Sequence, residues 1–569
     1  MGATSTESAL TAIPQKHLSL LRRLLPLELP LAMAGAIFLL AAVLPLRELG
    51  FFEAVFSDSW SWVFWPTHIL FPWWANITSG TDTGHAIGPS LLALSRIEAF
   101  MLLGTFLVVF LPYLIALYKL PQRVSYRYLL ISTLLLGLLY VLIPIVTSQD
   151  VFLYIGYARM AILHHLNPLT TPPTAIRTDP VYSRIFWTQQ PSLYGPTWII
   201  PLAALQWLGL KLGLQSISPM ILLLRLFGLT VHMGSTQLVW SLSGHLQHHE
   251  GSVSLLRRKQ VTLAFGWNPL LLIEACVNVH ADTLMLFLVL LFIWVLIRGR
   301  EKDSDIATGV WLCAAVVLAL ATGVKVNIAI LVPGFLLYAW TRGHRLRTML
   351  LISTGYLGTL VVLYAPFWAH GAIIDSLLVN PSSYRNVNSP AEFLYNSYRS
   401  IVHLWGFPPA LSFISPLEKI MHTLSILIFL GAYAWLCWKA RNGLHTAVQM
   451  VYWMTIAWLV YCVFGSPWFW PWYAVTLFGL LMLVASVRNG YMPAWIRGLC
   501  KSSRFLPGIT FLAFNILSLY CFLALGPQLS VIPGLPGFHW SYLRGLWISL
   551  LPFLVLVVPI MRRARQEKG

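Results

Sequence analysis

The stretch DTLMLFLVLLFIWVLIR, residues 282–298, decides the structural class of this protein. Between Asp282 and Arg298 it carries no charge, and comparable apolar runs recur along the 569-residue chain. A helix of about twenty apolar residues is long enough to cross a hydrocarbon layer roughly 30 Å thick. Membrane-spanning β-strands would need alternating segments of about ten residues, and no such segments are visible. The sequence therefore predicts an all-α, polytopic helical membrane protein.

The composition excludes a soluble globular protein. Hydrophobic residues make up 58% of the chain, charged residues make up only 10%, and the mean hydropathy is +0.73. So little charge cannot cover a folded globule in water. The net charge of +18 would suit a nucleic-acid-binding protein, but the cytoplasmic loops of membrane proteins also collect Lys and Arg. We therefore expect membrane lipid, and no nucleic acid, as a partner.

The apolar segments predict about fourteen transmembrane helices. They lie near residues 30–47, 97–117, 127–147, 219–243, 260–277, 282–298, 307–323, 326–340, 348–367, 419–437, 445–464, 474–487, 508–525 and 541–560. A further apolar stretch at 198–212 could be another span or a helix that lies in the outer interface.

The distribution of basic residues decides between these two alternatives. If 198–212 crosses the membrane, the basic residues 257–259 fall outside while those near 119–127 stay inside. If 198–212 lies in the interface, the inner segments hold 25 of the 37 Lys and Arg residues, as the positive-inside rule requires. The sequence then predicts a multi-pass protein of the cell membrane with both termini cytoplasmic. Its sizeable outer segments would be 47–96, 148–220, 369–420 and 527–540, so activity is expected at the extracytoplasmic face.

The outer segment 148–220 contains the most informative residues. Asp150 directly follows the predicted span, and the stretch 154–163 is amphipathic and too short to cross the membrane. It ends in His164-His165-Leu166-Asn167-Pro168, and Tyr194-Gly195-Pro196-Thr197-Trp198 opens the second apolar stretch. Two short interfacial helices could hold the Asp150 carboxylate at the membrane surface, over a lipid-borne substrate. The alternative for Asp150 is an ordinary solvated helix end.

Further motifs follow in a fixed order. They are Trp267-Asn268-Pro269 with Glu274, His280-Ala281-Asp282, Lys325 after a Gly, and the run Ser466-Pro467-Trp468-Phe469-Trp470-Pro471-Trp472-Tyr473. Together with the outer segment, this order resembles the polyprenyl-phosphate-sugar-dependent mannosyltransferases of the GT-C superfamily, and most closely their bacterial α-1,6-mannosyltransferase branch. The likeness covers residues 127–340. The chain departs from the family at 278–282, where Asn-Val-His-Ala-Asp replaces Asn-Gly-His-Asn-Asp, and this departure weakens any role carried over to that segment.

The resemblance implies a GT-C-like fold with a catalytic membrane module at 127–340. The flanking parts would be a cytoplasmic tail at 1–29, N-terminal helices and a first outer loop at 30–126, C-terminal helices at 341–560 and a cytoplasmic tail at 561–569. It also implies that Asp150 is a general base in the inverting transfer of a sugar. In the family that the chain resembles, this sugar is mannose. The donor would be a polyprenyl phosphate sugar, and the acceptor a glycan or glycolipid.

A multi-pass transporter or a lipid-linked sugar flippase is the alternative function. Such a protein would place its functional polar residues near the bilayer midplane. This sequence instead concentrates them at one face.

Cationic side chains are expected near the donor phosphate, where negative charge grows as the bond to the sugar breaks. Lys325, Arg225 and Lys211 are the candidates on the outer side, although Lys211 is more typical of an interfacial anchor. An ammonium at the ends of two apolar helices is costly without a partner, so Lys325 indicates a site, although it could also snorkel to the interface. Arg225 could instead pair with an acid inside the bundle.

The remaining candidates would contact the sugar or the acceptor. They are His164, His165, Asn167, Tyr194, Trp198, Asn268, Glu274, His280 and Asp282. Glu274, an acid at membrane depth, could act in the site or form a structural hydrogen bond. His280 and Asp282 could hold a divalent metal or acceptor hydroxyls, or Asp282 could cap the following helix. Apart from such a metal, no cofactor is expected.

Overall fold

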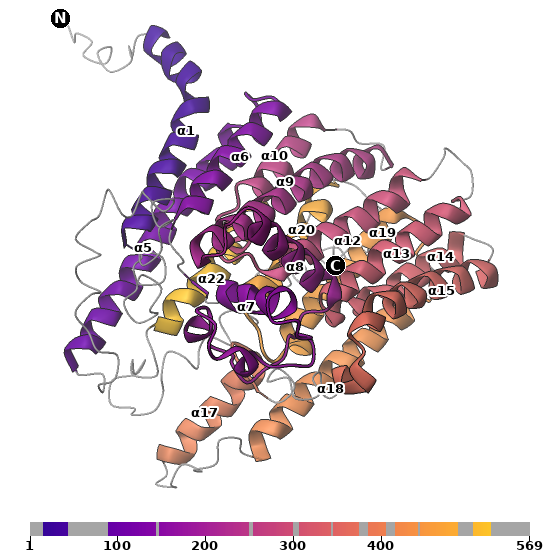
Figure 1. Cartoon of the computed structure of the whole chain (residues 1–569). Coiled ribbons are helices and arrows are strands. Elements are labelled where there is room, and N and C mark those ends of the chain that lie inside the picture. The colour runs from indigo at the N-terminus through magenta and orange to yellow at the C-terminus, as the bar shows by residue number, and fades with distance from the viewer. Residues whose placement is uncertain are drawn as a thin grey trace, which may run out of the picture.

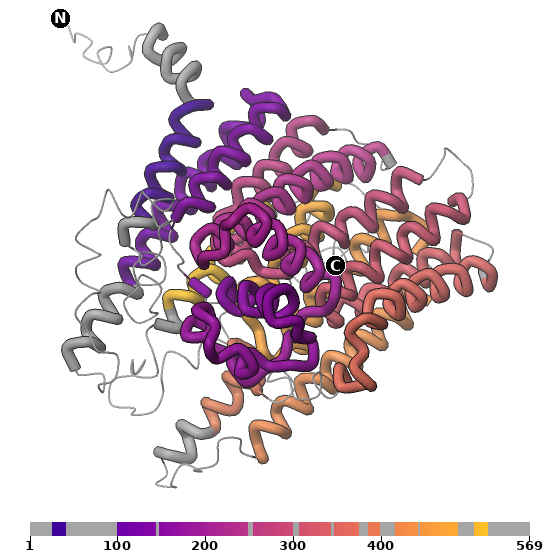
Figure 2. The backbone as a smooth tube through the Cα atoms, viewed as in Figure 1, coloured from indigo at the N-terminus to yellow at the C-terminus, as the bar shows by residue number. Residues whose placement is uncertain are grey.

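A computed structural model of the chain describes residues 15–43, 89–143, 147–148, 150–249, 254–299, 306–342, 345–374, 385–404, 416–441, 444–487 and 505–524 (Figure 2). All regular secondary structure in these ranges is helical, apart from one bridge between Val387 and Trp468. The prediction of an all-α protein is therefore confirmed. The predicted span 541–560 lies outside the described residues.

The helices follow one another along the chain in the order shown in Figure 1. The α-helices are α1 (Gln15–Val43), α5 (Pro89–Lys119), α6 (Tyr126–Leu142), α7 (Asp150–Ile162), α8 (Pro196–Lys211), α9 (Ile217–His249), α10 (Leu255–Gly266), α11 (Pro269–Leu272), α12 (Ala281–Arg298), α13 (Thr308–Val324), α14 (Val332–Arg342), α15 (Arg345–Tyr364), α17 (Pro390–Leu404), α18 (Pro416–Lys439), α19 (Ala447–Val460), α20 (Ala474–Ser486) and α22 (Phe505–Ala524). The short 3₁₀ or π turns are η3 (Pro173–Ile176), η4 (Tyr182–Arg184), η5 (Ile273–Val277), η6 (Val326–Leu331), η7 (Ala365–Phe367), η8 (Ala369–Gly371), η10 (Tyr461–Gly465) and η11 (Pro471–Tyr473).

Six helices in the described part of the chain are long and apolar enough to cross a membrane, or seven when the bent pair Leu255–Gly266 and Pro269–Val277 counts as one span. Shorter apolar helices account for the other predicted spans, again with 541–560 excepted. The positions of the apolar helices were thus predictable, whereas a total of about fourteen crossings is not established. The bend of 45° in the pair follows from Asn268-Pro269, because proline lacks the N–H that would continue the helix.

A hydrogen bond and an aromatic stacking contact show which helix ends lie together. The Arg257 guanidinium at the start of α10 donates to the carbonyl oxygen of Ala485 at the end of α20, at 2.7 Å. Tyr126 at the start of α6 stacks on Trp240 in the later part of α9, with ring centroids 4.3 Å apart. The basic helix ends near 119–127 and 257–259 therefore share one end of the bundle.

Arg225 in α9 marks the opposite end. Its buried guanidinium donates to the carbonyl oxygens of Val141 at 2.9 Å and Val277 at 3.0 Å, and also to that of Ile143. These contacts join the end of α6, the early part of α9 and the end of η5. Asp150, which follows α6 closely, thus lies at the end of the bundle away from the basic clusters.

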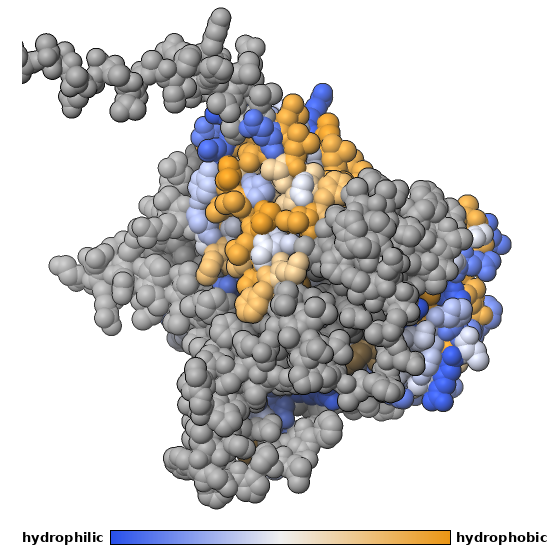
Figure 3. Space-filling model, turned by 90° about the vertical axis from the view of Figure 1, so that its left-hand side faces the viewer, coloured by the Kyte–Doolittle hydropathy of each residue, from blue (hydrophilic) through white to orange (hydrophobic). Residues whose placement is uncertain are grey.

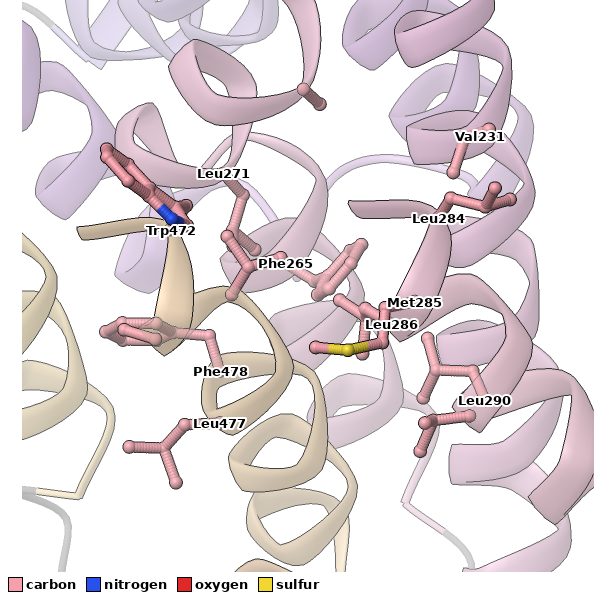
Figure 4. Close-up of a cluster of buried hydrophobic side chains, with 14 of the residues drawn as sticks. Val231, Phe265, Leu271, Leu284, Met285, Leu286, Leu290, Trp472, Leu477 and Phe478 are labelled. Atoms are coloured by element: carbon pink, nitrogen blue, oxygen red, sulfur yellow. The ribbon is translucent and has the colours of Figure 1, made fainter. Parts of the chain in front are cut away.

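The interior between the helices is apolar. Phe265 of α10, Leu271 of α11 and Phe478 of α20 belong to one cluster of buried side chains, shown in Figure 4. On the face shown in Figure 3, apolar residues form a band that hydrophilic residues border along its upper edge. This arrangement is expected of a bundle whose outer surface meets hydrocarbon at mid-height and polar groups at its ends.

The two short helices of the segment 148–220 pack against each other (Figure 1). Ten of the residues in α8 are partly or fully exposed, whereas α7 is buried over most of its length, from Val151 to Ala158 and at Met160. We predicted an amphipathic helix at 154–163, and the structure instead encloses α7 among its neighbours. Enclosure fixes the position of Asp150, the first residue of α7.

Candidate active site

Asp150 stands at the N-terminus of α7, with 15% of its side chain exposed. Its backbone N–H donates to the Ser148 hydroxyl at 3.2 Å. A carboxylate in the first turn of a helix is favoured by the free N–H groups and the helix dipole. Asp150 therefore combines a fixed backbone with a side chain that solvent or substrate can reach.

His280 lies between Asp150 and Glu274. Its Nδ1 is 2.5 Å from Glu274 Oε2, and its Nε2 is 3.5 Å from Asp150 Oδ2. The ring is fully buried, stacked on Trp472 with centroids 4.0 Å apart, and it also meets the Tyr154 ring edge to face. Asp150 and the nearby pair Glu274 and His280, which is distant from Asp150 in sequence, thus form a carboxylate–imidazole–carboxylate row.

The backbone turn before α12 orients the imidazole. Val279 adopts φ = +56°, a left-handed conformation that is rare for a β-branched residue. The turn lets the His280 N–H donate to the Glu274 carbonyl oxygen at 2.9 Å, and it places His280 at the N-cap of α12. Such strained backbone is often found at functional sites, where the surrounding structure holds it in place.

Glu274 is completely buried in the π turn η5, yet its carboxylate is well supplied with donors. Tyr520 Oη donates to Oε1 at 2.7 Å, and Asn278 Nδ2 donates to Oε2 at 3.1 Å. Asn278 in turn accepts a hydrogen bond from the Thr147 hydroxyl at 2.9 Å. A buried carboxylate tolerates the loss of water only when donors or charges replace it, and here three side chains do so.

The charge of the row favours a protonated imidazole. Burial disfavours the imidazolium, but Glu274 and then Asp150 attract it more strongly, so the pKa of His280 is raised to about 9. At neutral pH both ring nitrogens therefore carry protons and can donate to the two carboxylates.

Lys325 has the partner that its position requires. Its Nζ lies 3.2 Å and 3.1 Å from the two carboxylate oxygens of Asp282, and 3.9 Å from the centre of the Tyr473 ring. Burial lowers the pKa of Lys325, while the Asp282 carboxylate opposes that shift. Lys325 follows α13 and Asp282 lies in the first turn of α12, so the pair joins two apolar helices at the site.

An aromatic cluster of Tyr154, Tyr194 and Trp198 connects α7, which begins with Asp150, to Lys325. The hydroxyls of Tyr154 and Tyr194 are 3.2 Å apart, and Trp198 meets the Tyr154 ring edge to face at 5.2 Å. Lys325 lies 5.7 Å from the Tyr194 ring centre. The N–H of Gly195 donates to the carbonyl oxygen of Val324 at 3.0 Å. This hydrogen bond keeps Tyr194 next to Lys325.

The other predicted residues lie outside this cluster of contacts. Arg225 donates to backbone carbonyls, and the Asn268 side chain caps α11 by accepting from the N–H of Leu270 at 3.0 Å. His164 contacts Asp179 at 2.9 Å, and Asn167 donates to the carbonyl oxygen of Phe367 at 2.9 Å. His165 is exposed, with φ = +53°. These contacts are with groups of the protein outside the cluster around Asp150.

The structure separates the predicted pair His280 and Asp282. The imidazole faces Glu274 and Asp150, whereas Asp282 faces Lys325. Among the residues that the structure describes, no three His, Cys, Asp or Glu side chains are grouped so that they could hold a metal ion. The side chains of His280 and Asp282 are thus both engaged in ion pairs within the protein.

Sequence reasoning did not assign Tyr154, Asn278 or Tyr520 to the site, and it named Trp472 and Tyr473 only as part of an aromatic motif. The run that contains Trp472 and Tyr473 fits a motif, but an interfacial belt of aromatics accounts for it equally well. Tyr520 lies inside an apolar span, and nothing in the neighbouring sequence marks it. Only the packing of α22 against the bundle brings its hydroxyl to Glu274.

Comparison with known proteins identifies a family for part of the chain. No curated protein matches the chain in a sequence search. Residues 81–342 match the family model described as alpha-(1->6)-mannopyranosyltransferase, N-terminal domain. This range contains Asp150, Glu274, His280, Asp282 and Lys325, and it encloses the range in which the sequence resembles mannosyltransferases. The chain is therefore a glycosyltransferase of the mannosyltransferase class, as the match of its residues 81–342 to the alpha-(1->6)-mannopyranosyltransferase N-terminal domain indicates.

Proposed function

We propose that this protein transfers mannose, with inversion, from a polyprenyl phosphate donor to a hydroxyl of a glycan or glycolipid acceptor at the extracytoplasmic face. The observation that carries the proposal is the setting of Asp150. It is a partly exposed carboxylate beside an otherwise buried set of charges, at the N-terminus of an enclosed helix. The family match supports mannose as the sugar.

Asp150 is the general base in this proposal. Its carboxylate accepts the proton of the acceptor hydroxyl while the hydroxyl oxygen bonds to the anomeric carbon. The bond from that carbon to the phosphate oxygen breaks, and its electron pair leaves with the polyprenyl phosphate. One displacement inverts the configuration, so a β-linked donor gives an α-mannoside. A base in this role must come within about 3 Å of the hydroxyl in the productive complex.

Lys325 is the proposed partner of the donor phosphate. An ammonium has three N–H donors, and in the structure two of its contacts are with the Asp282 oxygens. A remaining N–H can therefore be directed to a phosphate oxygen as negative charge develops there. Arg225 is less suited to this role, because its recorded donations go to backbone carbonyls.

The distribution of charge supports an extracytoplasmic site. The basic helix ends join at one end of the bundle through Arg257 and Ala485, and Asp150 lies at the other end. Cytoplasmic segments are the ones that collect Lys and Arg. On this orientation a lipid donor of the outer leaflet presents its phosphate near Lys325.

The decisive experiment replaces Asp150 by Asn, which keeps the size of the side chain and removes its basicity. We expect Asp150→Asn to lower transfer from a sugar-labelled polyprenyl phosphomannose by about a hundredfold or more, with donor binding nearly unchanged. Asp179→Asn is the matched control, since Asp179 lies in the same outer segment but pairs with Arg159 and His164. Retention of most transfer by Asp150→Asn would exclude this residue as the base.

A further inference from the structure

We propose that His280, held by Glu274, is a positioning residue that orients Asp150 for proton transfer. The inference rests on the proposed role of Asp150 as the general base. It assigns the buried row a purpose other than contact with the sugar, because neither His280 nor Glu274 has an exposed side chain.

The imidazole is held at Nδ1, at one face of its ring and at its backbone N–H. Glu274 Oε2 lies 2.5 Å from Nδ1, Trp472 stacks on one face of the ring, and the His280 backbone N–H is bonded to the Glu274 carbonyl. Glu274 is held in turn by Tyr520 at 2.7 Å. The direction of Nε2 is therefore set by the protein before any substrate arrives.

Nε2 lies within ion-pair distance of one oxygen of the Asp150 carboxylate and has no hydrogen-bond partner in the described part of the protein. Its distance to Asp150 Oδ2 is 3.5 Å, which is an ion-pair distance that can shorten to a hydrogen bond when substrate binds. With Oδ2 turned to the imidazolium, Oδ1 is the oxygen left for the acceptor hydroxyl. Restricting the carboxylate to one orientation favours the geometry in which the hydroxyl proton can be taken.

The charged groups around His280 come from several elements. Glu274 of η5 and Asp150 of α7 face the two nitrogens, and Asp282 of α12 acts from further away, with its charge balanced by Lys325. Tyr154 of α7, Tyr520 of α22 and Trp472 of η11 complete the surroundings without adding charge at neutral pH. The surplus of carboxylate favours the imidazolium and raises the pKa of His280 to about 9.

Loss of the imidazolium proton would turn the attraction between His280 and the Asp150 carboxylate into a repulsion. A neutral ring keeps its Nδ1–H for Glu274, so a lone pair on Nε2 faces the ionised Asp150 oxygen and repels it. The positioning effect is thus present below pH ~9 and lost as the pH rises through that value. A merely structural role would lower activity by a similar factor at all pH values.

The test is the pH dependence of kcat for transfer from sugar-labelled polyprenyl phosphomannose to a mannooligosaccharide. We expect the wild-type kcat to fall above pH ~9. In His280→Gln we expect kcat to be roughly ten- to hundredfold lower, KM for the donor to change little, and the decline near pH 9 to disappear. In Glu274→Gln the decline should move to lower pH, because the carboxylate that favours the imidazolium is gone.

His232→Gln is the matched control. His232 is also buried, but its Nε2 faces the carbonyl oxygen of Gly266 and its ring stacks on Phe265. This variant should keep the wild-type pH profile even if its stability falls. Persistence of the decline near pH 9 in His280→Gln would overturn the inference, since the decline would then belong to another group such as Lys325.

The two proposals fail in different ways. Active Asp150→Asn protein contradicts the proposed function itself. Inactive Asp150→Asn together with an unchanged pH profile in His280→Gln contradicts only the positioning role. If Glu274→Gln does not fold, His280→Gln and Tyr520→Phe still test the positioning role. Tyr520→Phe removes one donor to Glu274 while keeping its charge, and should leave the decline near pH 9 or move it upward.

Discussion

Asp282 accepts both hydrogen bonds that the structure records for the Lys325 ammonium, so each charge is balanced by the other. At the residue scale, sequence alone indicated that a lysine between two apolar helices needs a partner. The spacing between residues 282 and 325 gave no means to identify that partner. His280 and Glu274 were separate candidates for substrate contact, and the sequence did not show that they contact each other.

The proposed binding of the donor phosphate by Lys325 can be tested separately from its ion pair with Asp282. Lys325→Ala leaves a buried carboxylate without its cation, which typically costs about 3–5 kcal/mol of stability. The double variant Lys325→Met with Asp282→Asn removes both charges and should recover most of that loss. If Lys325 binds donor phosphate, the double variant still binds a polyprenyl phosphomannose analogue roughly ten- to hundredfold more weakly, as measured by ligand-dependent thermal shift. Full donor affinity in the double variant would limit Lys325 to balancing Asp282.

At the element scale, the segment 260–277 was predicted as one span and is a bent pair whose second half ends in the π turn η5. The break at Asn268-Pro269 is visible in the sequence, but the π turn η5 is not. That turn places Glu274 against His280, and it packs closely on α9. A Cβ atom at Gly228 of α9 would lie 2.0 Å from the carbonyl oxygen of Ala275, so only glycine permits this approach.

Gly228→Ala tests whether the position of η5 matters for catalysis. The added methyl group must push η5 away from α9, and we expect a loss of about 1–3 kcal/mol in stability and a clear fall in transfer. Gly358→Ala in α15 is the control, because nothing lies within 4 Å of its Cβ. There alanine should be neutral or stabilise the helix by about 0.5–1 kcal/mol. Equal activity in the two variants would show that the contact between α9 and η5 is not required.

At the scale of the whole molecule, the separation of charge sets the expected orientation. Thr178 is exposed in the segment 148–220, which contains Asp150, and Gln122 is exposed in the basic connection between α5 and α6. Contacts at Tyr126 and Arg225 place these two regions at opposite ends of α6. The positive-inside rule then predicts that they lie on opposite sides of the membrane.

Cysteine labelling tests that orientation in cells. In a protein whose six native cysteines are replaced, Thr178→Cys should react with a membrane-impermeant maleimide in intact cells. Gln122→Cys should react only after the membrane is permeabilised. The reverse pattern would put Asp150 on the cytoplasmic side and contradict an extracytoplasmic transfer reaction. Thermal stability of both variants serves to show that neither substitution disturbs the bundle.

The sequence by itself determined the helical class, the position of each apolar helix within the described residues, and the nearness of Asp150 to a helix end. These are local properties, because hydropathy and charge along a short segment decide whether it can lie in hydrocarbon. The tertiary structure decided the partners. Tyr520 and Glu274 are 246 positions apart, and only helix packing brings them into contact. Pairing among buried polar groups depends on which helices are neighbours, and that information is not contained in any one segment.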